Sequence, residues 1–205
     1  MADLARLPAL PEQPVKLARV QASLLRVDGL GLVELRLSPG DAAALEIASG
    51  LAGFALPAAP RRAAKKDGLA ALCLAPDRWL LTGERGRVAP LAPALREALA
   101  GSPFEVLDVS DAYATLRIDG ADSTRLLLMA SSTDLTREPL SEGRCRRIRL
   151  GLIDAVMRMH RVRRGTLFDL HVARSYARDA WTWLEMAGEL TPPAPLFTKA
   201  APPLV

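Results

Sequence analysis

Apolar and polar residues alternate along Leu32–Leu37, which is the pattern of a β-strand with one buried face. The turn residues Ser38-Pro39-Gly40-Asp41 end this strand. Asp41 is a predicted N-cap, because its carboxylate can accept hydrogen bonds from the free amides of a following helical turn. We therefore expect a helix over Ala42–Ser49, ended by Gly50.

A second segment, Leu116–Leu126, resembles the first one at a distance of 81 residues. The residues in register are Leu35/Leu116, Arg36/Arg117, Leu37/Ile118, Asp41/Asp122 and Leu45/Leu126. Gene duplication would explain this agreement, and so would chance, since leucine and arginine are abundant in this chain. We favour duplication.

The elements that follow in the two halves are also alike. A turn precedes an apolar strand at Pro76–Leu81 and at Arg164–Leu170, and a helix follows at Pro90–Ala100 and at Ser175–Ala187. Each half therefore has the order strand, helix, strand, strand, helix. This order favours an α+β fold with helices layered on a sheet over a doubly wound parallel sheet. The ferredoxin-like split βαβ unit is the nearest named motif.

Prolines gather at both ends of the chain, where they disfavour helices and central strands. The expected division is an extended N-terminal arm at 1–20, a first α+β half at 21–107, a second α+β half at 108–190, and a proline-rich C-terminal arm at 191–205. Within the first half, residues 53–68 contain the basic run Arg61-Arg62-Ala63-Ala64-Lys65-Lys66, which we expect to be a solvated loop.

Composition places the chain among soluble globular proteins. Half of its 205 residues are apolar, and a chain of this length hides roughly 70% of its unfolded surface. The sequence has no charged, apolar leader and no run of about 18 apolar residues that could span a membrane. Its two cysteines, Cys73 and Cys145, are far apart in sequence. We expect a cytoplasmic protein without a membrane partner.

The net charge of +4 and the pI near 9.5 raise the question of nucleic-acid binding. Aromatic residues make up only 4% of the chain, and no stacking platform alternates with the basic residues. We therefore expect no nucleic-acid partner.

Candidates for catalysis are few. Asp169 and His171 share one face of a predicted strand and could form part of a dyad, and His160 ends the preceding strand. No Gly-x-Ser-x-Gly elbow accompanies them, so we favour histidines that are simply packed and hydrogen-bonded. Asp108 and Asp111 could serve acid–base chemistry, but we favour a strand end at which Asp111 or Ser110 caps a turn between the halves.

Sites for cofactors and metals are not indicated either. Gly29-Leu30-Gly31 precedes a strand instead of opening a helix, and no phosphate-binding loop motif occurs. The isolated histidines and cysteines lack the spacing of zinc ligands. We therefore assign no catalytic residue, no cofactor site and no metal site to this chain.

Arginines are concentrated in the second half of the chain. On a strand, alternation sends Arg144 and Arg146 to one face, while Arg147 and Arg149 point to the other. Buried on both sides they would need charged partners, so the strand is expected at a sheet edge or in contact with carboxylates. Since arginine is favoured at protein interfaces, a subunit contact and a solvated edge are both open.

The last predicted helix has a wide apolar zone. Tyr176, Ala180, Trp183 and Ala187 form one stripe, and Trp181 lies on a neighbouring face. We expect Trp183 to pack inside with Tyr176 and Ala180, and Trp181 to face a second layer or a partner. The candidate subunit interface consists of Arg144, Arg146, Arg147, Arg149, Arg174 and Trp181.

Several short motifs in this order resemble those of the gamma subunit family of heterotetrameric sarcosine oxidase. They are Leu74-Ala75-Pro76-Asp77-Arg78-Trp79-Leu80-Leu81, Asp108-Val109-Ser110-Asp111, the stretch from Leu135 through Gly143-Arg144-Cys145 to Leu150-Gly151, and Ala173-Arg174-Ser175-Tyr176-Ala177 with Trp181 and Trp183. The resemblance covers roughly residues 30–190, and none of these motifs is a catalytic signature.

The resemblance implies a fold similar to part of the folate-dependent aminomethyltransferases, together with an accessory role. In such a complex, alpha and beta subunits carry NAD, FAD, FMN and the tetrahydrofolate site, and a delta subunit holds zinc. The complex demethylates sarcosine oxidatively and passes the one-carbon unit to tetrahydrofolate. A related complex, such as N-methylglutamate dehydrogenase, and a stand-alone folate-binding aminomethyltransferase are the alternatives, the latter with Asp108 or Asp111 as its carboxylate.

Overall fold

The computed structural model describes residues 8–135, 142–162 and 165–192. The first half of the fold consists of β3 (Leu30–Leu37), α1 (Ala42–Ala52), β4 (Ala63–Lys66), β5 (Leu69–Ala75), β6 (Arg78–Glu84), α2 (Arg85–Val88), α3 (Leu91–Ala98) and β7 (Phe104–Asp108). The second half consists of β8 (Tyr113–Gly120), α4 (Ser123–Ala130), β9 (Cys145–Leu150), β10 (Ile153–Val162), β11 (Gly165–Ala173), the short 3-10 turn η1 (Arg174–Tyr176) and α5 (Ala177–Leu190). Two N-terminal strands, β1 (Val15–Lys16) and β2 (Ser23–Val27), precede both halves.

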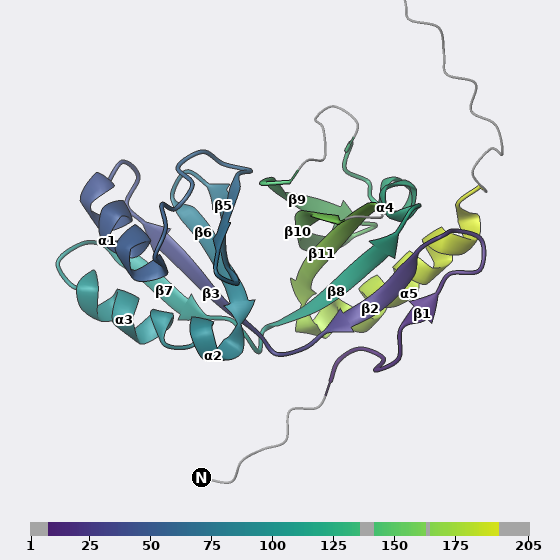
Figure 1. Ribbon diagram of the computed structural model, residues 1–205, viewed down its shortest axis with the longest axis horizontal. Coiled ribbons are helices and arrows are strands. Elements are labelled where there is room, and N and C mark those ends of the chain that lie inside the picture. Colours follow the sequence, from purple (N-terminus) through teal and green to yellow (C-terminus); the bar gives the residue numbers. More distant parts are fainter. Residues whose placement is uncertain (1–7, 136–141, 163–164, 193–205) are drawn as a thin grey trace, which may run out of the picture.

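The strands form two antiparallel sheets that face each other, with helices on the outer side of each (Figure 1). The first sheet has the order β4-β5-β6-β3-β7, and the second has the order β1-β2-β8-β11-β10-β9. The two orders are equivalent when β8 replaces β3 and β2 replaces β7. The predicted α+β fold with two similar halves is therefore confirmed.

The place of β2 differs from the expected division of the chain. β2 pairs with β8 and not with the first sheet, so that Leu24 lies opposite Ile118. Residues 23–27, which we expected in the first half, thus complete the sheet of the second half (Figure 1). Strand pairing at this sequence separation leaves no local signal, because alternation indicates a strand and not its neighbour.

Helix α1 begins as predicted and ends later than predicted. The carboxylate of Asp41 accepts a hydrogen bond from the amide of Ala44 at 2.9 Å, which confirms the N-cap. The helix continues through Gly50 and ends before Gly53, whose φ of 80° is left-handed. Glycine ends a helix where it adopts this conformation, and Gly50 does not adopt it.

The basic run between α1 and β5 is not wholly a loop. Residues Ala63–Lys66 form the edge strand β4, which pairs with β5 so that Lys65 lies opposite Ala70. Both lysines stay exposed, as expected of a charged segment. The amide of Ala63 donates to the carbonyl of Gly143 at 2.9 Å, so this segment also joins the two halves.

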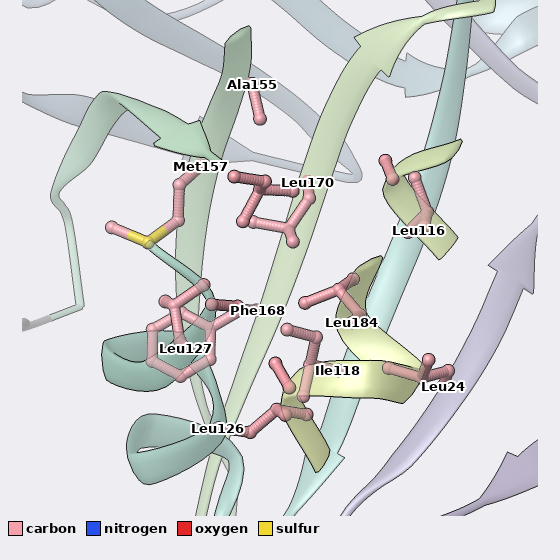
Figure 2. Packing of buried hydrophobic residues seen from close by; sticks show 14 of the residues in the cluster. Leu24, Leu116, Ile118, Leu126, Leu127, Ala155, Met157, Phe168, Leu170 and Leu184 are labelled. Carbon is pink, nitrogen blue, oxygen red and sulfur yellow. The ribbon is translucent and has the colours of Figure 1, made fainter. Parts of the chain in front are cut away.

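Each sheet packs its outer face against its own helices. In the second half, Leu116 and Ile118 of β8, Phe168 and Leu170 of β11 and Leu184 of α5 meet in one core, to which β2 adds Leu24 (Figure 2). A smaller cluster fills part of the space between the sheets, and its buried members are Leu32, Leu72, Leu80, Cys145 and Val156.

The two tryptophans of α5 are placed opposite to the prediction. Trp181 is 3% exposed and belongs to the core of the second half, while Trp183 is 38% and Tyr176 55% exposed. The buried stripe of the helix runs through Ala177, Trp181 and Leu184, at positions i, i+4 and i+7. The expected inner position of Trp183 is therefore wrong, since that side chain lies at the flank of the stripe.

None of the helices in the described part of the chain combines the length and the apolar character needed to cross a bilayer.

Candidate site between the two sheets

Polar side chains occupy the inner face of the second sheet. Because neighbouring residues on a strand point to opposite faces, the side chains between the apolar core positions of β8, β10 and β11 turn toward the first sheet. They include Thr115, Arg117, Arg158, His160, Asp169 and His171, of which Thr115, Asp169 and His171 are buried.

Asp169 is the centre of a charged network on this face. It accepts hydrogen bonds from Nε and Nη2 of Arg117 at 2.7 and 2.9 Å, and its second oxygen lies 2.8 Å from Nε2 of His160. Burial alone would raise the pKa of Asp169, but the hydrogen bonds from His160 and Arg117 outweigh it and hold this pKa well below its usual range. Asp169 is therefore an ionised and paired structural carboxylate.

His171 does not form the dyad that its spacing from Asp169 suggested. Two residues along a strand are about 6.6 Å apart, so side chains on the same face lie side by side without bonding. Nδ1 of His171 instead lies 2.8 Å from the hydroxyl of Thr115, and its Nε2 has no hydrogen-bond partner among the described residues. Burial lowers the pKa of His171 to about 4, so the imidazole is neutral at pH 7.

A cavity of about 260 Å³ adjoins His171 between the two sheets. Glu34 of β3 and Arg78 of β6 line it from the first sheet, and Tyr113 of β8 and Arg147 of β9 line it from the second. The hydroxyl of Tyr113 lies 3.4 Å from Oε1 of Glu34. Burial and the nearby Glu34 raise the pKa of Tyr113, while Arg147 and Arg78 oppose this rise. The charged groups of both halves therefore meet around one phenol.

A second hollow, of about 420 Å³, lies where the chain crosses between the halves. Arg85 pairs with Asp111 there at 2.8 Å, and Arg174 lines the same hollow. Asp108 accepts hydrogen bonds from the amide and the hydroxyl of Ser110, at 3.0 and 2.6 Å. Asp108 is therefore the capping carboxylate of this turn, whereas we expected Asp111 or Ser110 in that role.

The arginine-rich strand β9 lies at the edge of the second sheet. An edge position was one of the two placements expected for this strand, the other being contact with carboxylates. Its residues alternate as predicted, because Ile148 and Leu150 join the helix-covered core while Arg147 lines the cavity between the sheets. Arg149 pairs with the exposed Asp154 at 3.1 Å. Arg144 and Arg146 are half-buried.

Sequence reasoning thus identified His171, Asp169 and Arg147, but it did not connect them with Glu34, Arg78 and Tyr113. The alternation of apolar and polar residues in β3 did indicate the position of Glu34. Glu34 stands between Val33 and Leu35, whose side chains face the outer core, so its own side chain had to face the other half.

Comparison with known proteins agrees with this architecture. The chain is similar to a chain of the heterotetrameric sarcosine oxidase from Corynebacterium sp. U-96, with a TM-score of 0.73 and 24% identity over 86% of this chain and 88% of that one. It is also similar to aminomethyltransferase T of the glycine cleavage system from Bartonella henselae, with a TM-score of 0.62 and 16% identity over 81% of this chain and 46% of that one. No curated protein matches the sequence significantly.

The two facing sheets with helices outside therefore define an aminomethyltransferase-like α+β protein. Within this class, residues 37–189 match the model of the sarcosine oxidase gamma subunit family. The chain belongs to that family.

Proposed function

We propose that this chain is the gamma subunit of a heterotetrameric sarcosine oxidase complex, in which it has an accessory, structural role. The observation that carries the proposal is the family match over residues 37–189, which covers both halves of the fold. The similarity to a chain of a heterotetrameric sarcosine oxidase along nearly the whole length of both chains supports it.

In this proposal the chemistry takes place in partner subunits. Alpha and beta subunits hold FAD, FMN, NAD and the tetrahydrofolate site, and a delta subunit holds zinc. Asp169 supports this assignment, since it is locked in ion pairs with Arg117 and His160 and is not poised as a base.

We propose a smaller subunit interface than the one expected from the sequence. Arg149 is exposed at the sheet edge and Arg174 lines the hollow between the halves, so both remain in the proposed contact together with Arg144 and Arg146. Trp181 is excluded from the proposed contact, because its side chain is buried in the core of this chain. Arg147 points into the cavity between the sheets.

We add an exposed apolar stripe on α5 to the proposed subunit contact. Trp183, Met186 and Leu190 are 38%, 52% and 70% exposed and follow one another at i, i+3 and i+7. The ring of Trp183 lies over Gly151, next to Leu152, which is 88% exposed. Contiguous apolar surface of this kind is typical of protein–protein contacts, and the large subunits of the proposed complex are its expected occupants.

The proposal is tested by omitting this chain. The remaining subunits are co-expressed with and without it, and the yield of assembled complex and the sarcosine-dependent reduction of its flavin are measured. We expect the complex to be lost or strongly diminished without the chain and restored when it is supplied. Assembly and turnover that are equal in both preparations would exclude an accessory subunit role.

The contact surface is tested by charged substitutions within the co-expressed complex. We expect Met186→Glu and Arg149→Glu to lower the recovery of the complex at least tenfold, since burying an unpaired charge in an interface costs about 3–5 kcal/mol. Ala43→Glu, on the exposed side of α1, and Arg87→Glu, on α2, are the matched controls. Equal recovery of all four variants would place the contact elsewhere.

A further inference from the structure

The cavity between the two sheets has the features of a ligand site that the proposed structural role does not use. Its walls come from six strands of both halves, so its shape depends on the fold as a whole. The side chain of Val156 on β10 forms an apolar wall, and charged and polar groups converge from the other sides. A confined space with an apolar wall and a few convergent polar groups is the common form of small-molecule sites.

The buried imidazole of His171 supplies the most specific signal. His171 is 1% exposed, and its Nδ1 is hydrogen-bonded to the hydroxyl of Thr115. Its Nε2 has no hydrogen-bond partner among the described residues. Leaving such a group unsatisfied is unfavourable for the folded protein. A ligand atom that bonds to Nε2 removes this cost, and so the protein gains free energy from occupation of the cavity.

The charges around the cavity select the chemical class of the ligand. Arg78 and Arg147 approach from opposite sheets, and both act electrostatically on the hydroxyl of Tyr113. Glu34 faces the same phenol and balances one of the two guanidinium charges. Asp154 also lines the cavity, but it pairs with Arg149. One positive charge therefore remains, in a form that matches a planar carboxylate.

We propose that this cavity binds a small organic carboxylate, whose carboxyl group lies between Arg78 and Arg147 and which bonds to Nε2 of His171. The apolar side chain of Val156 covers the carbon part of the ligand. This proposal does not depend on the proposed subunit role, since every residue involved belongs to this chain.

The test uses the full chain with benzoate as the probe and benzamide, its uncharged analogue, as the control ligand. Binding is measured by calorimetry and by the ¹⁵N and ¹H resonances of His171, which are assigned by comparison with His160→Gln. We expect saturable binding of benzoate that shifts the His171 resonances, and binding of benzamide that is at least tenfold weaker.

Arginine variants provide the second arm. Arg147→Gln removes a guanidinium from the cavity wall and should weaken benzoate binding about tenfold or more. Arg87→Gln removes a guanidinium from the exposed surface of α2, outside the cavity, and should leave the affinity within twofold of the parent. The proposal is overturned by unshifted His171 resonances at saturating benzoate, by equal affinity for benzamide, or by equal affinity of Arg147→Gln and the parent.

Discussion

Trp181 and Trp183 stand two positions apart on α5 and lie in different environments. Trp181 is buried against β-sheet and helix side chains, whereas Trp183 is 38% exposed and donates its indole N–H to the carbonyl of Ala130 at 2.7 Å. We expect Trp181→Ala to lower the free energy of unfolding by about 3–5 kcal/mol. Trp183→Ala should lower it by roughly 1–2 kcal/mol. Urea denaturation of both variants measures the difference, and an equal loss in the two would refute the assigned core.

His171 should make stability depend on pH in a defined window. Its pKa is about 4 in the folded chain against an ordinary value of 6.5, so the unfolded chain takes up a proton first as the pH falls. The contribution of neutral His171 is therefore complete above pH 6.5 and is lost between pH 6.5 and 4. The full loss is about 3 kcal/mol.

The control for this pH dependence is His171→Gln, which has no ionisable group at the position. Its free energy of unfolding should stay nearly constant between pH 6.5 and 4, whereas that of the parent should fall. Asp169 does not interfere, because it loses its stabilising contribution only as the pH falls through its ordinary pKa of 3.8 and below, and because the parent and the variant share it. The same slope in the parent and in the variant would show that His171 does not cause it.

At the residue scale, the sequence predicted which side chains carry charge or polarity on the inner face, and it did not predict their partners. The alternation around Asp169 and His171 placed both on one face. The bond between Asp169 and His160 depends on the register of β10 against β11, which puts Leu167 opposite His160 and Asp169 opposite Arg158. Register is set by the packing of the whole sheet.

At the scale of elements, Gly50 and Gly53 of α1 form a matched pair. A methyl group at Gly50 meets open space in a helical backbone, so Gly50→Ala should raise the free energy of unfolding by about 0.5–1 kcal/mol. Gly53 has a φ of 80°, which disfavours a side chain, and Gly53→Ala should lower it by about 1 kcal/mol. Thermal unfolding of the two variants should give shifts of opposite sign, and a stabilising Gly53→Ala would contradict the assigned helix end.

The pairing of β2 with β8 rests on a close backbone approach at Gly120. This residue has a φ of 133°, and a Cβ atom there would lie 2.2 Å from the carbonyl oxygen of Gln21. We expect Gly120→Ala to lower the free energy of unfolding by at least about 2 kcal/mol, because strain and a backbone clash add. Gly101→Ala, which meets no atom within 4 Å, is the control. Similar denaturation midpoints of the two variants would contradict this packing.

Local sequence patterns predict individual strands and helix caps, but they do not predict which strands pair. The strand over Leu32–Leu37 and the cap at Asp41 follow from neighbouring residues, and both were predicted. Residues 23–27 fell within the range expected for the first half, but they form a strand whose partner, β8, lies about ninety residues further along the chain. Alternation cannot choose between partners at that distance.

At the scale of the whole molecule, the two halves have equivalent strand orders and enclose a common interior. The N-terminal β2 completes the second sheet, and Ala63 and Gly143 join the sheets by a backbone hydrogen bond. A variant that lacks residues 1–28 should therefore lose the cooperative unfolding of the second half, which hydrogen exchange on β8 would detect. Unchanged protection of the β8 amides would show that β2 is dispensable.

The central claim is that this chain works as one subunit of a larger flavoprotein complex, and native mass spectrometry tests it most directly. The tagged chain is purified gently from cells that also express the proposed partner subunits. We expect a heterotetramer that contains this 22.0 kDa chain in stoichiometric amount and carries flavin. A colourless species at the mass of this chain alone, from cells in which the other subunits are abundant and soluble, would contradict the account.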